Sequence, residues 1–107
     1  MSEILRRVQT LALRGEIEVS RHGLRELAAD DIMLADIVAG LAAAEAIEDY
    51  PGFHKGPSVL TLQRDSSGRP VHVLWGIERD AEGPAVVVTA YRPDPRRWTD
   101  DFTRRRQ

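Results

Sequence analysis

Residues 58–92 read SVLTLQRDSSGRPVHVLWGIERDAEGPAVVVTAYR, and this stretch decides the fold class. Val, Ile, Thr and aromatic residues dominate three segments of it, which predicts three β-strands, at residues 58–64, 70–79 and 84–92. Two turns with the pattern Arg-Asp-x-x-Gly separate these strands, at 64–68 and 79–83. Asp caps such a turn and Gly accepts a positive φ, so the strands are expected to form consecutive antiparallel hairpins.

The register of these hairpins follows if both loops have four residues. Arg64 then opposes Arg69 and Arg79 opposes Pro84, and alternation sorts the side chains onto two faces. The face expected under the helices is apolar, with Leu60, Leu62, Val71, Val73, Trp75, Ile77, Val86, Val88 and Ala90. The other face is more polar, with Val59, Thr61, Gln63, His72, Leu74, Gly76, Val87, Thr89 and Tyr91. A slip of one residue in the first hairpin would move Leu60 and Leu62 to the polar face, so the cleaner pattern is preferred.

The first half of the chain predicts three helices. Ser2 caps the first, which ends near Gly15, and Ser20 caps the second after a short extended segment at 16–20. Asp30 or Asp31 is expected to cap the third. Apolar residues at helical spacing are predicted to face the core, namely Ile4, Leu5, Val8, Leu11, Ala12, Leu24, Leu27, Ala28, Ile32, Leu34, Ala35, Val38, Leu41 and Ala42.

A further strand is expected near residues 46–50. No linker separates the helical and β halves, so we expect one α+β domain over residues 1–107, with a basic C-terminal tail from about residue 99. In this arrangement the helices pack on one face of an antiparallel sheet.

Composition excludes several classes of protein. The 107 residues contain no cysteine, which excludes a disulfide framework and thiolate metal sites and fits a reducing cytosol. No apolar run is long enough for a signal peptide or a membrane span, so a cytoplasmic location without membrane contact is expected. The three histidines are scattered and no phosphate-binding loop is present, so neither a metal nor a cofactor is expected.

Charge is distributed unevenly around a net value of −2. Residues 30–50 hold six acids and no base, whereas residues 91–107 hold six arginines and three aspartates. The two segments either face different partners or are ordinary solvated surfaces. Fourteen of the 15 basic residues are Arg, which binds phosphate bidentately and is compatible with RNA.

The polar face of the predicted sheet brings His72 and Tyr91 together, with Thr89 near them and Arg92 just beyond. An imidazole can act as general acid or base, and a guanidinium can hold a phosphate. These groups suffice for RNA cleavage by the 2′-hydroxyl without a metal. The alternative is ordinary cross-strand packing of His72 on Tyr91.

Two further groups are candidates for contacts with RNA. His22, with Arg21 and Arg25, stands at the start of a helix, where anions are favoured, although it can equally be a residue that packs on the sheet. In the tail, Arg96 and Arg97 precede Trp98, so that the segment either stacks on single-stranded RNA or is clipped onto the domain by Trp98. Beyond it, residues 104–106 are three consecutive arginines.

Several motifs carry a resemblance to a known family. In the first half they are Ser20-x-His22, Asp36-Ile37-Val38 and Glu48-Asp49-Tyr50-Pro51. In the second half they are Gly68-x-Pro70-x-His72-Val73-x-Trp75 and Val88-Thr89-x-Tyr91-Arg92-Pro93-x-Pro95-x-x-Trp98. From about residue 17 to 98 the chain resembles the domain-of-unknown-function family numbered 4258, which is placed near the RelE/ParE-like and BrnT-like toxins. The family often has an Arg before the third helix, where this chain has Asp30-Asp31.

The resemblance implies a RelE-like toxin fold and an endoribonuclease that cleaves mRNA, on the ribosome or free. It also implies an antitoxin partner, of the zinc-finger type, and no DNA ligand. On this hypothesis His72 and His22 are acid–base groups, Tyr91 a proton donor or stacking group, and Arg92 a phosphate clamp. The alternative is a non-catalytic protein-binding module on the same fold, which the net negative charge favours.

Overall fold

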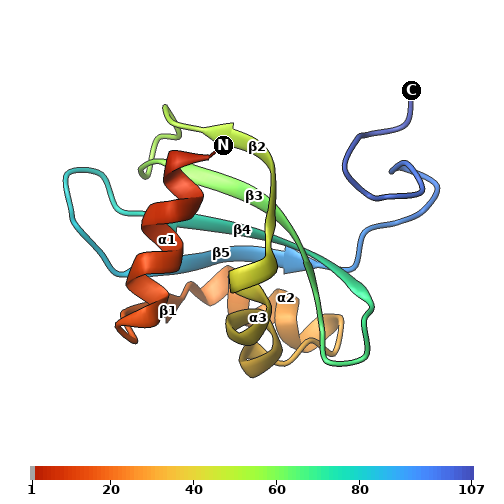
Figure 1. The fold of residues 1–107 in the computed structure, drawn as a ribbon, viewed down its shortest axis with the longest axis horizontal. Coiled ribbons are helices and arrows are strands. Elements are labelled where there is room, and N and C mark those ends of the chain that lie inside the picture. The colour runs from red at the N-terminus through yellow and green to blue at the C-terminus, as the bar shows by residue number, and fades with distance from the viewer. Residues whose placement is uncertain (1) are drawn as a thin grey trace.

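The computed structural model describes residues 2–107 and has most of its helices in the first half of the chain and most of its strands in the second (Figure 1). The helices are α1 (Glu3–Leu13), α2 (Arg21–Ala29), α3 (Leu34–Gly40) and a short 3-10 helix (Leu41–Ala43). The strands are β1 (Ile17–Val19), β2 (Glu45–Tyr50), β3 (Ser58–Arg64), β4 (Pro70–Ile77) and β5 (Ala85–Tyr91). The predicted α+β class is therefore correct.

The sheet is mixed, which corrects the predicted antiparallel sheet. Its order is β1-β5-β4-β3-β2, and β1 runs parallel to β5 while the other neighbours are antiparallel. Ile17 pairs with Ala85 and Val19 with Val87. A pairing over this sequence separation leaves no local signal, because hairpin turns determine only the pairing of consecutive strands.

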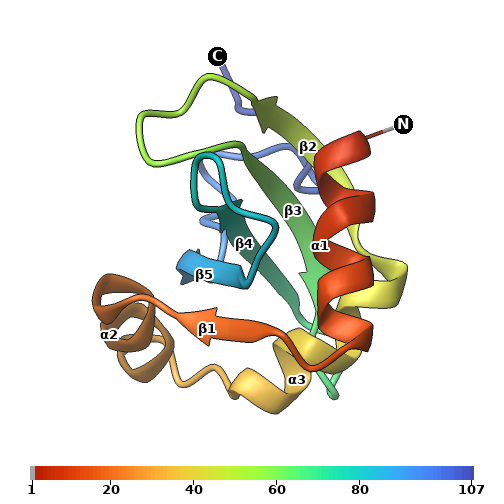
Figure 2. The ribbon, with the colours of Figure 1, turned by 90° about the vertical axis from the view of Figure 1, so that its left-hand side faces the viewer.

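Helices α1 and α3 cover one face of the sheet, and α2 packs at its β5 end, where Leu27 joins the same core. Figure 2 shows the loop between β2 and β3 on the side away from α1. Helices α1 and α3 contact β3, and α2 contacts β5. We call the side of the sheet turned away from α1 the open face.

The first hairpin has the register that the sequence pattern disfavoured. Arg64 pairs with Pro70, not Arg69, and Leu62 pairs with His72. Ser66, Ser67 and Gly68 form a three-residue turn in which Gly68 has φ 80° and the Asp65 N–H donates to the Arg69 carbonyl. Asp65 Oδ1 also accepts from the Ser67 and Arg69 amides, at 2.9 Å each. Three-residue loops with Gly in the left-handed region are common in hairpins, and here one residue fewer in the loop exchanges the two faces of β3.

Polar residues of β3 consequently lie in the core, where they are hydrogen-bonded. Gln63 Nε2 donates to the Ile37 carbonyl at 2.8 Å, and Trp75 Nε1 donates to Gln63 Oε1 at 2.8 Å. Thr61 Oγ1 donates to the Val73 carbonyl at 2.9 Å. Because these groups have partners, burying them beside apolar residues carries no penalty for unpaired polar atoms. Leu60 and Leu62 lie on the open face instead.

The second hairpin pairs His72 with Tyr91, as predicted, but its turn differs. A register shift between Leu74 and Trp75 places Trp75 opposite Val87 and Ile77 opposite Ala85. The strands therefore end before Arg79 and Pro84, which do not pair. Val87 joins the core on the helix side, where Val86 and Val88 were expected.

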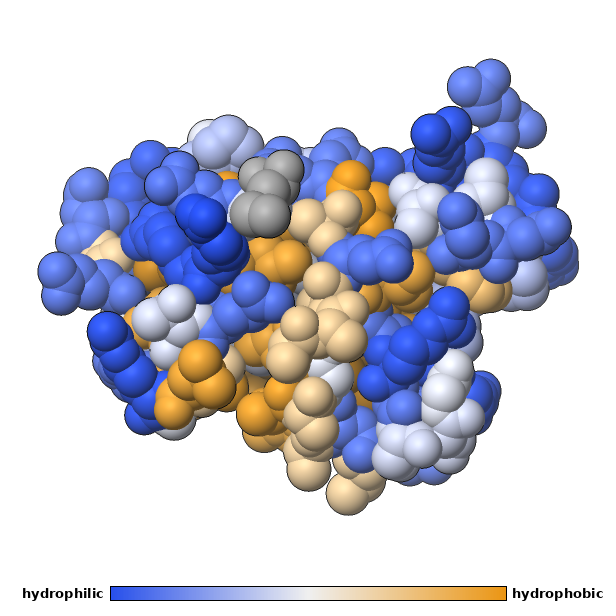
Figure 3. Space-filling view, in the orientation of Figure 1, coloured by the Kyte–Doolittle hydropathy of each residue, from blue (hydrophilic) through white to orange (hydrophobic). Residues whose placement is uncertain are grey.

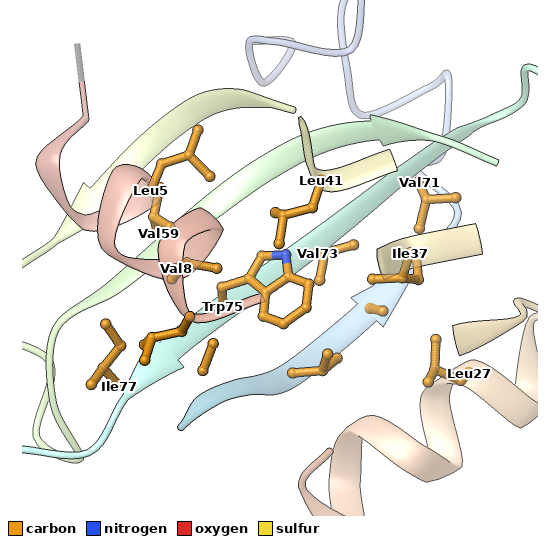
Figure 4. Packing of buried hydrophobic residues seen from close by; sticks show 14 of the residues in the cluster. Leu5, Val8, Leu27, Ile37, Leu41, Val59, Val71, Val73, Trp75 and Ile77 are labelled. Carbon is orange, nitrogen blue, oxygen red and sulfur yellow. The ribbon is translucent and has the colours of Figure 1, made fainter. Parts of the chain in front are cut away.

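The hydrophobic core lies between α1, α3 and the sheet, around the fully buried Trp75 (Figure 4). Leu5, Val8 and Leu11 of α1 are buried as predicted, and so is Leu27 of α2. Leu24 and Leu34 are not, since they are 62% and 38% exposed. Figure 3 shows the surface over α1 and α3 as apolar residues interspersed with charged ones.

Helix α3 begins later than predicted, which explains the wrong assignment of its inner face. Its N-cap is Met33, without a side-chain hydrogen bond, so neither Asp30 nor Asp31 caps it. Asp31 has a positive φ of 54° in the turn after α2. Ile37, rather than Leu34, faces the core and is 1% exposed. Within residues 2–107, no helix has the length and apolar character needed to cross a bilayer.

Candidate functional site

Ser20 fixes the start of α2 against β5. Its Oγ accepts from the Gly23 amide at 2.9 Å, which caps the helix, and donates to the Val88 carbonyl at 2.9 Å. A Cβ on Gly23 would lie 2.5 Å from the Val87 carbonyl oxygen, so only glycine permits this close approach. The segment Ser20-x-His22-Gly23 thus positions the His22 side chain relative to the open face of the sheet.

A cleft of about 780 Å³ opens beside this helix start. One wall is the first turn of α2, with Arg21, His22 and Arg25, and the facing wall is the loop before β3. The floor between them is the open face of β3, β4 and β5. Residues of the facing wall and floor include Phe53, Lys55, Gly56, Ser58, Gly76, Ile77, Glu78, Val86 and Val88.

The facing wall is held in place by its backbone. Gly56 has φ 140°, and a Cβ there would lie 2.0 Å from the Ile77 carbonyl oxygen, so this loop packs directly on β4. The Arg79 amide donates to the Lys55 carbonyl at 3.0 Å, and the Arg79 guanidinium donates to the Phe53 carbonyl. The side chains of Phe53 and Lys55 are therefore presented to the cleft by a constrained loop.

His22, which lines the cleft, contacts a carboxylate of its own helix. Its Nε2 lies 3.1 Å from Glu26 Oε1, one helical turn further along α2, and the imidazole is 64% exposed. Because a carboxylate only accepts, the contact assigns the proton of a neutral imidazole to Nε2 and leaves the Nδ1 lone pair free. Within residues 2–107, the side chains of Arg21, Arg25 and Lys55 make no ion pair.

The second candidate pair, His72 and Tyr91, lies further along the open face. Four residues of β4 separate His72 from Gly76 of the cleft floor, a distance of about 13 Å at 3.3 Å per residue. His72 Nδ1 is 3.2 Å from the Tyr91 hydroxyl, and the rings meet edge to face at 5.3 Å. The predicted juxtaposition of these two residues is therefore present.

The C-terminal tail covers His72. His72 Nε2 donates to the Phe102 carbonyl at 2.8 Å, so Nδ1 of the neutral ring accepts from the Tyr91 hydroxyl. Trp98 packs edge to face on the same imidazole, with centroids 4.3 Å apart. His72 is fully buried and both of its nitrogens are occupied.

Burial sets the protonation of this pair. Desolvation lowers the pKa of His72 below its ordinary value, with the Phe102 carbonyl opposing and the charge of Arg105 adding to the effect. Desolvation likewise raises the pKa of Tyr91. Both groups are thus neutral near pH 7, and the imidazole has no unoccupied lone pair to accept a substrate proton while the tail is in place.

Arg92 does not join either group. Its Nη1 lies 2.8 Å from Asp65 Oδ2, in the turn between β3 and β4, and its backbone amide donates to Asp30 Oδ2 at 2.8 Å. Hydrogen bonds from the Arg69 and Ser67 amides and the charge of Arg92 keep the pKa of Asp65 low, although burial opposes them. Asp30, which does not cap α3, thus anchors the residue after β5.

The other tail residues proposed for RNA binding differ in their exposure to solvent. Arg96 and Arg97 are exposed, and Arg96 pairs with Asp94 at 3.4 Å. Trp98 is buried and its ring carries the Arg105 guanidinium at 5.0 Å. Arg105 in turn binds Glu48 of β2 at 3.1 Å. Part of the basic tail is therefore paired with the acidic segment of the same chain.

Sequence patterns alone missed Phe53, Lys55 and Glu78, which line the cleft, and Glu26, which contacts His22. The spacing of four residues between His22 and Glu26 is a helical pairing signal, which could have identified their contact. Lys55 and Phe53 carried no such signal, because the loop reaches the cleft only through the packing of Gly56 on β4. In residues 2–107, no three His, Asp or Glu side chains are grouped so that they could hold a metal ion.

Comparison with known proteins identifies a family but no characterised relative. A search of curated proteins and a search of solved structures each find no significant match. A family model described as "Domain of unknown function (DUF4258)" matches residues 19–92, from β1 to the residue after β5, and so includes the cleft and the His72–Tyr91 pair. The chain therefore belongs to the DUF4258 family.

Proposed function

We propose that the protein is a toxin-like, metal-independent RNA endonuclease of the RelE/ParE-like type, made as one member of a toxin–antitoxin pair. The observation that carries the proposal is the cleft, in which an exposed, Glu26-bound His22 shares the α2 wall with Arg21 and Arg25 and faces the wall that carries Lys55. An imidazole with a free nitrogen, next to cations that have no ion-pair partner within residues 2–107, is the combination that phosphodiester cleavage requires.

The chemistry follows from the geometry of His22. Glu26 accepts from Nε2–H and orients the ring, so Nδ1 takes the proton of a ribose 2′-hydroxyl. The 2′-oxygen attacks the adjacent phosphorus, and the bond from phosphorus to the 5′-oxygen breaks. The imidazolium returns its proton to that leaving oxygen, directly or through water, so the products are a 2′,3′-cyclic phosphate and a 5′-hydroxyl. Arg21 and Arg25, on the same wall as His22, offset the charge that develops on the phosphate.

The proposal favours His22 over His72 as the acid–base residue. His72, Tyr91 and Arg92 would form a second arrangement only after the tail had left His72 and Arg92 had left Asp65. The cleft needs neither change.

The test is an in vitro cleavage assay on a defined mRNA, with and without ribosomes, using variants whose fold is checked by circular dichroism. His22→Ala is expected to lower the rate by about 10²–10⁴-fold, because a general acid–base group contributes that much. His54→Phe is the matched control, since His54 is an exposed histidine of the facing loop that does not line the cleft, and a phenyl ring keeps an aromatic contact with Phe53. Loss of cleavage in His72→Ala, with His22→Ala active, would move catalysis to the tail-covered pair. No cleavage by the wild-type protein in either condition would contradict the nuclease proposal.

The second candidate function is a non-catalytic protein-binding module. The observation that favours it is the tail, whose Trp98 and Phe102 carbonyl occupy the end of the open face beside His72. A surface that holds a peptide segment by one aromatic ring and one backbone carbonyl could hold a similar segment of an antitoxin. Coexpression with the product of an adjoining zinc-finger reading frame, followed by size-exclusion chromatography, tests it. A stable complex without any RNA cleavage would favour the module.

A further inference from the structure

We infer that the cleft between α2 and the loop before β3 binds single-stranded RNA by seating one unpaired base on the open face of the sheet, with the adjoining phosphate on α2. This inference deepens the proposed function, since it names the form of RNA that the site takes and the way in which it is held. It depends on the floor, the two walls and their charges.

Gly76 contributes no side chain to the floor of the cleft. A Cβ at this position would lie 3.0 Å from Ser58 Oγ and 3.1 Å from Val88 Cγ2, so a larger residue would have to displace these neighbours. Val86 and Val88 line the floor beside Gly76 and are half-buried. An apolar floor in an open cleft complements the face of a nucleobase, which carries its polar groups on its edges.

Phe53 adds an aromatic wall next to this floor. It is half-buried and already stacks obliquely on His54, with centroids 4.6 Å apart and planes at 43°. Its backbone is held by Arg79, so the ring is presented by an ordered loop. Aromatic side chains of this kind bind successive bases of single strands with little dependence on sequence.

The two walls differ in charge, and this difference orients the ligand. The α2 wall carries Arg21 and Arg25 together with the positive end of a nine-residue helix. Among the residues that line the cleft, the facing wall carries one cation, Lys55, and one anion, Glu78, so its net charge is lower than that of the α2 wall. A phosphate is therefore favoured at the α2 wall, near His22, and the base at the facing wall, near Phe53.

The size of the cleft sets the class of ligand. About 780 Å³ is within the range of roughly 300–1,000 Å³ found for small-molecule sites and accommodates a nucleotide and its flanking phosphates. A base can reach the floor only if it leaves its stack. An unpaired strand meets this condition at little cost, whereas a duplex would have to open.

The experiment uses the full chain and an RNA that it cannot cleave. A fluorescently labelled hexanucleotide with 2′-fluoro groups at every position lacks the attacking hydroxyl, so its binding is measured by anisotropy independently of any nuclease activity. The second probe has the same sequence with one central abasic position, and the third is the hexanucleotide annealed to its complement. We expect the intact single strand to bind about 5- to 100-fold more tightly than the duplex, and the abasic strand to lose part of that affinity, since each stacked base contributes about 1–3 kcal/mol.

Variants locate the effect in the cleft. Phe53→Ala is expected to weaken binding of the intact strand about 5- to 100-fold and to remove its advantage over the abasic strand, whereas Phe53→Tyr retains both. Arg25→Gln is expected to weaken binding of all probes and to flatten its dependence on salt, and Arg7→Gln, at an exposed position of α1 that does not line this cleft, serves as the charge-matched control. Gly76→Ala gives a further test, provided that circular dichroism shows an unchanged fold.

Each outcome decides the inference. Equal affinity for intact and abasic strands, or an unchanged affinity in Phe53→Ala, would overturn the base seat. Tighter binding of the duplex would overturn the preference for single strands. Binding that depends on Phe53 in a protein that cleaves no RNA would support the seat and contradict only the nuclease proposal.

Discussion

The indole ring of Trp98 stands edge-on to the imidazole of His72, with centroids 4.3 Å apart and planes at 83°. This contact joins the C-terminal tail to β4 and decides how the tail lies. The sequence left two hypotheses for Trp98, namely stacking on RNA or attachment of the tail to the domain. The structure shows that Trp98 attaches the tail. The ring that could have stacked on RNA is buried between His72 and the Arg105 guanidinium.

We predict that Trp98→Ala exposes His72. Removing the indole also weakens the hold on Arg105, so the segment that brings the Phe102 carbonyl to His72 loses its anchor. Carbethoxylation by diethyl pyrocarbonate, mapped by mass spectrometry, is expected to modify His72 in the variant and not in the wild type. His22, which is 64% exposed, is the internal control and reacts in both proteins. Modification of His72 in the folded wild-type protein would show that the tail does not cover it.

Stability is predicted to fall in mild acid because of His72. Its pKa in the folded protein is lowered mainly by burial, so the unfolded chain, with an ordinary value near 6.5, binds the proton first as the pH falls. The free energy of unfolding therefore decreases from about pH 6.5 downward, and His72→Gln is expected to flatten that slope. Urea unfolding between pH 5 and 8 measures it, with His54→Gln as the control that keeps the slope. An identical slope in His72→Gln would mean that the folded protein does not hold this imidazole neutral.

A separate loss of stability is expected below about pH 4. Hydrogen bonds from Thr99 and Thr103 lower the pKa of Asp101 to about 2, so its folded carboxylate resists protonation until well below the ordinary 3.8. The contribution is present above pH 3.8 and is lost as the pH falls toward 2. Asp101→Asn is expected to reduce the pH dependence in this range, as measured by thermal unfolding, without changing the slope near pH 6.

Gln63→Leu is predicted to destabilise the protein although it replaces a polar residue by an apolar one in the core. The change leaves the Trp75 indole N–H and the Ile37 carbonyl without their partners, which costs about 1–3 kcal/mol. Trp75→Ala is expected to cost more, about 3–5 kcal/mol, through the cavity that it leaves. Chemical denaturation measures both, and Leu24→Gln, at an exposed position, should change little. In the register that the sequence pattern favoured, Gln63 would face solvent. An unchanged free energy of unfolding in Gln63→Leu would therefore support that register.

Arg92→Lys is predicted to lower the stability of the protein and to leave RNA binding in the cleft unchanged. An ammonium group can replace the charge opposite Asp65, but it sits on a shorter, flexible stem and lacks the rigid planar guanidinium, whose Nη1 lies 2.8 Å from Asp65 Oδ2 and 3.5 Å from the Pro70 carbonyl oxygen. We expect a lower melting temperature, with an unchanged affinity for the 2′-fluoro single strand. A variant of normal stability that has lost RNA cleavage would instead assign Arg92 to the phosphate.

The sequence predicted local features of the structure more completely than long-range ones. Ser2 and Ser20 cap their helices as expected, Trp75 is core, and His72 faces Tyr91. Each of these features depends on a few neighbouring residues, such as a cap followed by an apolar stripe, or on a strand whose alternation is visible in the sequence. The family match over residues 19–92 confirms the assignment made from the same motifs.

Tertiary structure decided the rest, because it depends on contacts between distant segments. A three-residue turn at Gly68 and the buried hydrogen bonds of Gln63 set the register of β3, and alternation alone favoured the wrong one, since it treats every polar residue as solvent-facing. Pairing of β1 with β5 brings His22 to the open face, and Gly56 brings Lys55 and Phe53 to meet it. The sequence by itself determined the order of the helices and strands and their approximate extent. Only the packing of those elements decided that His72 lies under the tail while His22 faces an open cleft.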